Sequence, residues 1–109
     1  MVATLISHEP ATGAELWRGE MGDAEQEIGI ARAAWPEWAA RPLAFRIETV
    51  RRFANAVRAA EEELVDCIAR ETGKPLWEAK TEVASVVAKV DISVAAYSER
   101  TGQKRLQGA

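Results

Sequence analysis

The stretch from residue 76 to residue 100, LWEAKTEVASVVAKVDISVAAYSER, decides the fold because its apolar residues repeat with the period of an α-helix. Successive members of this stripe lie seven, four, three, four and three residues apart. The stripe consists of Leu76, Val83, Val87, Val90, Val94 and Tyr97. Val86 and Ile92 lie beside the stripe, so we expect the helix to need cover on more than one flank.

Two more helices are predicted on the N-terminal side of this stretch. Gly73 followed by Pro75 is a stop signal and then a new start, so a helix over 61–72 ends there. A break in the apolar stripe near residue 60 separates it from a helix over 42–59, with Pro42 at the first position. The stripe of these two helices consists of Leu43, Ile47, Val50, Ala54, Val57, Leu64 and Ile68.

An earlier helix is predicted over 24–35. Asp23 is a suitable N-cap and apolar residues follow it at spacings of three and four. Pro36 lacks a backbone donor and clashes with the preceding turn, so we expect the helix to end or bend there. Trp35 and Trp38 then form an apolar pair beside a loop.

The first 22 residues predict a β-hairpin. Apolar and β-branched residues around 2–7 and 14–19 flank the turn sequence PATG at 10–13. The predicted fold class is therefore mainly α, with an N-terminal hairpin followed by four helices. We divide the chain into a β arm over 1–22, helices over 23–101 and a polar tail over 102–109 that we expect to fray.

The composition is that of one ordinary globular domain. The chain has 109 residues, 48% hydrophobic residues, 28% charged residues and a formal net charge of −3, which argues against disorder and against a nucleic-acid partner. Lys89 and Asp91 interrupt the longest apolar stretch, so we expect no membrane span, and no signal peptide is apparent. The single cysteine excludes an internal disulfide and fits a reducing cytoplasm.

Catalytic chemistry is nearly absent from the chain. No three of the seven glycines have the spacing of a phosphate-binding loop, and His8 and Cys67 are too few for a usual zinc site. Acidic neighbours raise the pKa of a thiol, so we interpret Cys67 as structural. Glu61–Glu63 fit the first turn of a helix, where carboxylates favour the dipole, better than an acidic site.

Several motifs, in this order and at these gaps, resemble the opening of the NAD(P)-dependent aldehyde dehydrogenase superfamily. They are the PATG turn, the helix ending AAWPEW at 33–38, Arg46, and the run ETGKP at 71–75. The run from Glu71 to Gly102 is most similar to the branch that oxidises N-succinylglutamate 5-semialdehyde in bacterial arginine breakdown. The likeness spans about residues 4–105 but only the opening part of a family member. It implies that the chain is the N-terminal piece of an α/β fold.

The resemblance implies an oxidoreductase in which a cysteine adds to the aldehyde, NAD takes the hydride and a glutamate activates water. In the family these residues and the cofactor loop lie downstream, so none has a matching position here. Cys67 does not match the nucleophile. We therefore expect no catalytic and no cofactor-binding residue in this chain, no bound NAD, and no activity of the chain by itself.

Four residues are carried over from the family as candidate site residues. Glu71 matches an acidic position that helps to hold a structural monovalent cation, although a solvated or capping role is the simpler alternative. Glu82, Val86 and Lys89 match the part of the long helix that borders the substrate entrance, where Lys89 would attract a carboxylate. The alternative is an ordinary surface lysine.

Two functions from different classes remain open. The first is the N-terminal part of a succinylglutamic semialdehyde dehydrogenase, with the remainder of that enzyme as its partner. The alternative is a separate helical interaction or oligomerisation module without catalysis. For the first we expect self-association, because surfaces shaped for a cofactor domain would otherwise stay uncovered. Glu9 replaces the asparagine usual before the proline, which leaves the turn geometry open.

Overall fold

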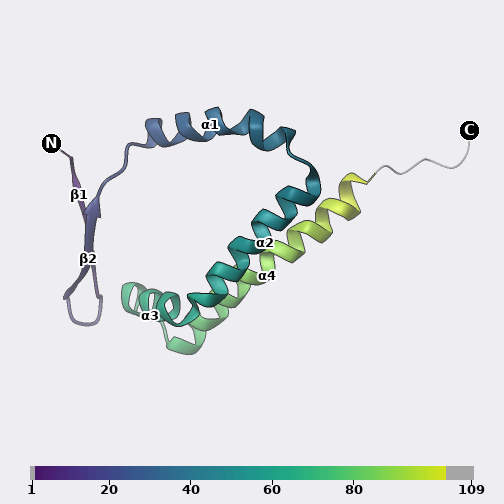
Figure 1. The fold of residues 1–109 in the computed structure, drawn as a ribbon. Helices are drawn as coiled ribbons and strands as arrows, with labels where there is room; N and C mark the ends of the chain where they lie inside the picture. Colours follow the sequence, from purple (N-terminus) through teal and green to yellow (C-terminus); the bar gives the residue numbers. More distant parts are fainter. Residues whose placement is uncertain (1, 103–109) are drawn as a thin grey trace, which may run out of the picture.

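The computed structural model describes residues 2–102, which form a two-stranded hairpin followed by four helices (Figure 1). This confirms the predicted fold class. The predicted tail falls almost wholly outside the described residues. The elements are β1 (Thr4–His8), β2 (Glu15–Glu20), α1 (Ala24–Ala40), α2 (Leu43–Ala59), α3 (Glu61–Thr72) and α4 (Leu76–Thr101).

The hairpin is antiparallel, with Thr4 opposite Glu20 and Ser7 opposite Trp17. Glu9 closes its turn, since the backbone N–H of Glu9 donates to the Ala14 carbonyl at 2.8 Å and its carbonyl accepts from Gly13 at 2.8 Å. Its side chain also accepts a hydrogen bond from Thr12 Oγ1 at 2.8 Å. The carboxylate at position 9 therefore supports the turn.

Helix α1 begins as predicted and ends later than predicted. The Asp23 side chain accepts hydrogen bonds from the N–H groups of Glu25 and Gln26 at 2.9 and 3.2 Å, so it is the N-cap. The expectation that the helix stops at residue 35 is wrong, because α1 runs through Pro36 to Ala40. Alanines at 33, 34, 39 and 40 favour the helix on both sides of the proline. It is Pro42 that ends α1, by holding Arg41 extended with ψ 144°.

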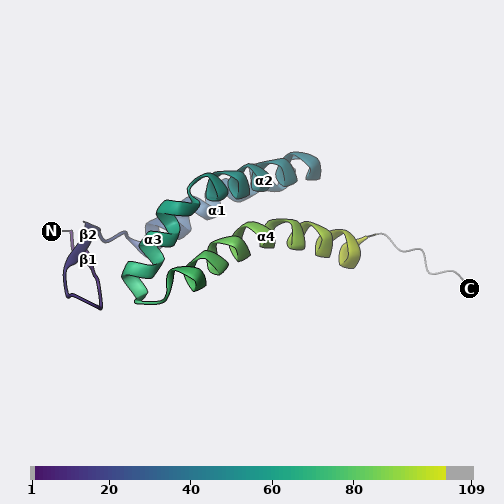
Figure 2. The ribbon, with the colours of Figure 1, turned by 90° about the horizontal axis from the view of Figure 1, so that it is seen from below.

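Helices α2, α3 and α4 form the packed part of the chain, in which α4 lies against both α2 and α3 (Figure 2). Helix α2 passes into α3 through a bend at Ala60, and α3 ends at Gly73 in the left-handed region with φ 74°, as predicted. The buried apolar residues in the described range are small: Ala54, Ala79 and Val83. The core is therefore a thin seam along α4.

The overall shape is an open arch (Figure 1). Helix α1 stands away from the α2–α4 pair, while the hairpin returns to the end of α3. The Cα radius of gyration is 19.4 Å, whereas a compact domain of this length has about 13 Å. None of the described helices has the length and apolar character needed to cross a membrane. Large apolar side chains on α1, α2 and α4 remain exposed.

Candidate functional site

Glu71 joins the hairpin to α3. Its Oε1 accepts a hydrogen bond from Ser7 Oγ at 2.7 Å and another from the Trp17 indole N–H. These bonds, that of Ser7 first, hold the pKa of Glu71 below its usual value. The Glu71 carboxylate is therefore neither a capping group nor fully solvated. With two donors on one carboxylate oxygen, Glu71 links the hairpin to α3 by hydrogen bonds. The monovalent cation expected there stays a prediction.

Further contacts strengthen this junction between the hairpin turn and the end of α3. The Arg70 guanidinium lies 3.7 Å from a Glu9 carboxylate oxygen. Pro10 lies beside Gly73: a Cβ built on Gly73 would be 4.0 Å from the Cβ of Pro10. Residues more than 50 positions apart thus hold the arch closed at one end.

Cys67 lies next to this junction and is half-buried. Burial raises the pKa of the Cys67 thiol, and the carboxylates of Glu71, Asp66 and Glu63 raise it further. The prediction that acidic neighbours suppress the thiolate is confirmed. A raised pKa is the opposite of what a nucleophilic cysteine requires.

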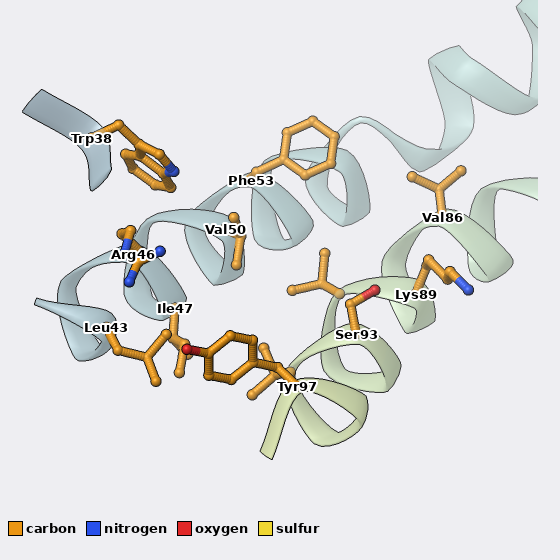
Figure 3. Close-up of a pocket in the computed structure, with 12 residues that line it drawn as sticks. Trp38, Leu43, Arg46, Ile47, Val50, Phe53, Val86, Lys89, Ser93 and Tyr97 are labelled. Carbon is orange, nitrogen blue, oxygen red and sulfur yellow. The ribbon is translucent and has the colours of Figure 1, made fainter. Parts of the chain in front are cut away.

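An apolar groove of about 510 Å³ lies between α2 and α4 (Figure 3). The sequence predicted its α4 wall as the apolar stripe, and Val86 and Lys89 also line it. Both walls together contribute Trp38, Leu43, Arg46, Ile47, Val50, Phe53, Val86, Lys89, Val90, Ser93, Val94 and Tyr97. The groove thus has an apolar floor and two cationic side chains.

Arg46 and Phe53 are groove residues that the apolar stripe of α2 did not identify. A second row at positions 46, 50, 53 and 57 has helical spacing and would have shown them. Arg46 Nε is buried and has no hydrogen-bond partner among the described residues. An unpaired buried donor is costly, so Arg46 Nε is an unsatisfied position in the groove wall.

A second apolar groove, of about 460 Å³, adjoins the first and is shared by α2, α3 and α4. Glu82 and Val86 line it, with Val57, Leu64 and Ile68 opposite. Glu82 is paired with Lys74 from the segment between α3 and α4, and this pairing raises the pKa of Lys74. Val86 therefore belongs to both grooves.

The structure brings three of the four predicted site residues together. Glu82, Val86 and Lys89 follow one another at helical spacing along the groove side of α4, whereas Glu71 lies apart at the hairpin junction. Within residues 2–102 no cluster of three metal-ligating His, Cys, Asp or Glu side chains occurs. This surface can bind and orient a ligand, but its described residues include no nucleophile paired with a base.

Comparisons with known proteins agree with this interpretation. The aldehyde dehydrogenase family profile matches residues 3–108. The N-succinylglutamate 5-semialdehyde dehydrogenase of Sphingopyxis alaskensis is 62% identical over 109 residues, which is 100% of this chain and 23% of that protein. The protein of the same name from Novosphingobium aromaticivorans is 63% identical over 107 residues, covering 98% of this chain and 23% of the relative. The Paraburkholderia xenovorans protein is 49% identical over 102 residues, or 91% of this chain and 21% of the relative.

The chain thus spans about a quarter of the length of the curated relatives it matches. Over that quarter the match is nearly complete, since the family profile reaches from residue 3 to residue 108. The chain belongs to the aldehyde dehydrogenase family.

Proposed function

We propose that this chain supplies the N-terminal scaffold of an NAD-dependent dehydrogenase that oxidises N-succinylglutamate 5-semialdehyde to N-succinylglutamate. The observation that carries this proposal is the 62% identity over the whole chain to a relative bearing that name. NAD, when bound by the whole enzyme, would accept the hydride from the aldehyde carbon. The partner of the chain is the remainder of such an enzyme, which provides nucleophile, base and cofactor loop.

Two parts of the chain would have separate tasks in this enzyme. The hydrogen bonds of Glu71 to Ser7 and Trp17 would hold the hairpin against the end of α3 and so fix its position relative to the helices. Helix α4 would border the substrate entrance with Val86 and Lys89. Lys89 has no carboxylate within 4.0 Å in the described part of the chain, so its charge is available to a substrate carboxylate.

A chimera tests the proposal. In the Sphingopyxis relative, the segment matched by this chain is replaced by residues 1–109, and NADH formation is measured with N-succinylglutamate 5-semialdehyde. We expect a kcat/KM close to that of the relative, because the scaffold carries no reacting group. A folded chimera that binds NAD but does not turn over this substrate would refute the proposal. The 109-residue chain by itself should form no NADH, and enzyme-dependent NADH would overturn its assignment as a scaffold.

The entrance role of Lys89 is tested in the same chimera. Lys89→Gln should raise KM for the anionic substrate by about threefold to tenfold at low salt, with kcat nearly unchanged, because it removes an attraction made equally in ground and transition states. Lys80→Gln on the same helix is the control, since Lys80 lies 3.8 Å from Glu61 and lines neither groove. Equal effects of both variants would contradict a specific role for Lys89.

A further inference from the structure

One side of α4 carries a row of side chains that begins with two carboxylates and ends with a cation. Positions 78, 82, 86 and 89 lie within an arc of about 80° around the helix, because successive residues turn by about 100°. The row consists of Glu78, Glu82, Val86 and Lys89. Glu82 and Val86 line the second groove, and Val86 and Lys89 line the first. The carboxylates thus share a side of α4 with the lysine that would attract the substrate.

These carboxylates lie near enough to Lys89 to oppose its attraction for an anion. Glu82 precedes Lys89 by seven residues, which is about 10 Å along the helix axis. The screening length is about 30 Å at 0.01 M salt, so the charge of Glu82 still acts at this separation. Two carboxylates against Lys89 alone would leave the row with an excess negative charge. An anionic substrate would then be repelled.

Lys74 supplies a compensating positive charge. Its ammonium group donates a hydrogen bond to the Glu82 carboxylate and lies 4.0 Å from Glu78 Oε1. The Lys74 side chain is 24% exposed, whereas the side chains of Glu78 and Glu82 are each 46% exposed. Ion pairs between fully exposed side chains contribute little, so the partial shielding of Lys74 favours a persistent pair. The hydrogen bond to Glu82 raises the pKa of Lys74, which keeps the lysine charged.

The backbone on both sides fixes the position of Lys74. Gly73 before it has φ 74°, and the ring of Pro75 after it holds φ at −59°. The N–H of Lys74 also donates a hydrogen bond to Thr72 Oγ1 at 3.4 Å. These contacts lie within the described residues, so they do not depend on what covers the grooves.

We propose that Lys74 determines specificity for anionic aldehydes: by neutralising the carboxylate of Glu82, it leaves the charge of Lys89 uncompensated at the substrate entrance. Lys74 acts through Glu82 and does not contact the substrate. The inference rests on the function proposed above, because it takes this side of α4 as the border of the entrance.

A cycle of charge removals in the chimera tests the proposal. The variants are Lys74→Gln, Glu82→Gln and the double variant. Their kcat and KM are measured with two anionic aldehydes, N-succinylglutamate 5-semialdehyde and succinate semialdehyde, and with neutral butanal. At 0.01 M salt we expect KM for the anionic aldehydes to rise about threefold in Lys74→Gln and to fall about threefold in Glu82→Gln. The double variant should return to the wild-type value, and KM for butanal and all kcat values should stay unchanged.

A merely structural ion pair predicts a different pattern. Loss of either partner then raises KM for charged and neutral aldehydes alike, and the double variant resembles the single variants. That pattern overturns the proposal. A change in KM that persists at 1 M salt, where the screening length is about 3 Å, also overturns it.

The matched control is the ion pair between Lys80 and Glu61, whose charged atoms lie 3.8 Å apart. Position 80 is about 160° around α4 from the middle of the row. Lys80→Gln and Glu61→Gln should therefore leave every KM unchanged. Shifts in KM for the anionic aldehydes as large as those of the Lys74 cycle would refute a role specific to Lys74.

Failure of this inference differs from failure of the proposed function. A chimera that oxidises succinate semialdehyde but not N-succinylglutamate 5-semialdehyde refutes the proposed substrate, and the Lys74 cycle is then measured with succinate semialdehyde. Normal turnover of both anionic aldehydes with equal KM in all variants refutes the role of Lys74 alone. A chimera that oxidises neither of them refutes both proposals.

Discussion

Val83→Ala should weaken the helical unit more than any comparable change on α4. Val83 is 3% exposed and lies among Val57, Leu64 and Ile68, where α4 meets both α2 and α3. Replacing valine by alanine removes two carbon groups, which at about 0.8 kcal/mol each gives a loss of about 1.6 kcal/mol before any cavity penalty. A domain of this length usually has a free energy of unfolding of about 5–15 kcal/mol. Because the core of this chain is thin, we expect its free energy of unfolding to lie at the low end of this range. The loss is then a large fraction of the total stability.

The assay is urea unfolding followed by circular dichroism, at a protein concentration low enough to keep the chain monomeric. The matched control is Val86→Ala on the same helix, because Val86 is 47% exposed and forfeits about half as much burial. We expect a decrease of about 1.6 kcal/mol for Val83→Ala and about 0.8 kcal/mol for Val86→Ala, with the same m-value. Equal losses would refute the conclusion that the seam around Val83 is the core.

Three further changes test local features of the structure. Because hydrogen bonds from Ser7 and Trp17 lower the pKa of Glu71, the wild-type advantage in stability over Glu71→Gln should be full above the unfolded-state pKa of about 4.3. It should be lost as the pH falls from there through the lower pKa of the folded state, read from melting curves and the Trp17 indole resonance. If this stability advantage is larger in sodium or potassium chloride than in choline chloride, a monovalent cation bound at Glu71 is supported. If the advantage is the same in all three salts, the hydrogen bonds of Glu71 alone account for it. Gly73→Ala should cost about 1 kcal/mol in unfolding free energy, since φ is 74° there. Pro36→Ala should slow amide hydrogen exchange in the middle of α1, because it restores a backbone donor; unchanged exchange would contradict this.

The start and end signals of the helices were readable from sequence because they are local. Asp23 caps the residues two and three positions further on, and Gly73 adopts the left-handed conformation at the residue that ends α3. The period of α4 likewise depends on neighbours within one or two turns. Pro36 was misjudged because its cost was weighed without the alanines around it, which maintain α1 on both sides.

The candidate site was only half predictable, because its parts meet across long sequence distances. The family resemblance identified Glu71, yet its bond to Ser7 spans 64 positions and no periodic pattern encodes such a contact. On the α2 side only Arg46 and Phe53 were missed, because Arg46 interrupts the apolar row that contains Phe53. A polar residue in an apolar row is usually assigned to solvent, whereas here Arg46 lines the groove.

The arch explains why strong apolar patterning coexists with so small a core. A helix with apolar residues on more than one flank is stabilised only if each flank is covered, and α4 covers one flank with α2 and α3 while Val86, Ile92 and Tyr97 stay exposed. The same holds for α1, whose stripe contacts little of its own chain. Periodicity therefore specifies which faces must be covered but not by what. In the enzyme proposed above, the remainder of the dehydrogenase would cover the α2–α4 groove and so supply the apolar contacts that these faces lack here.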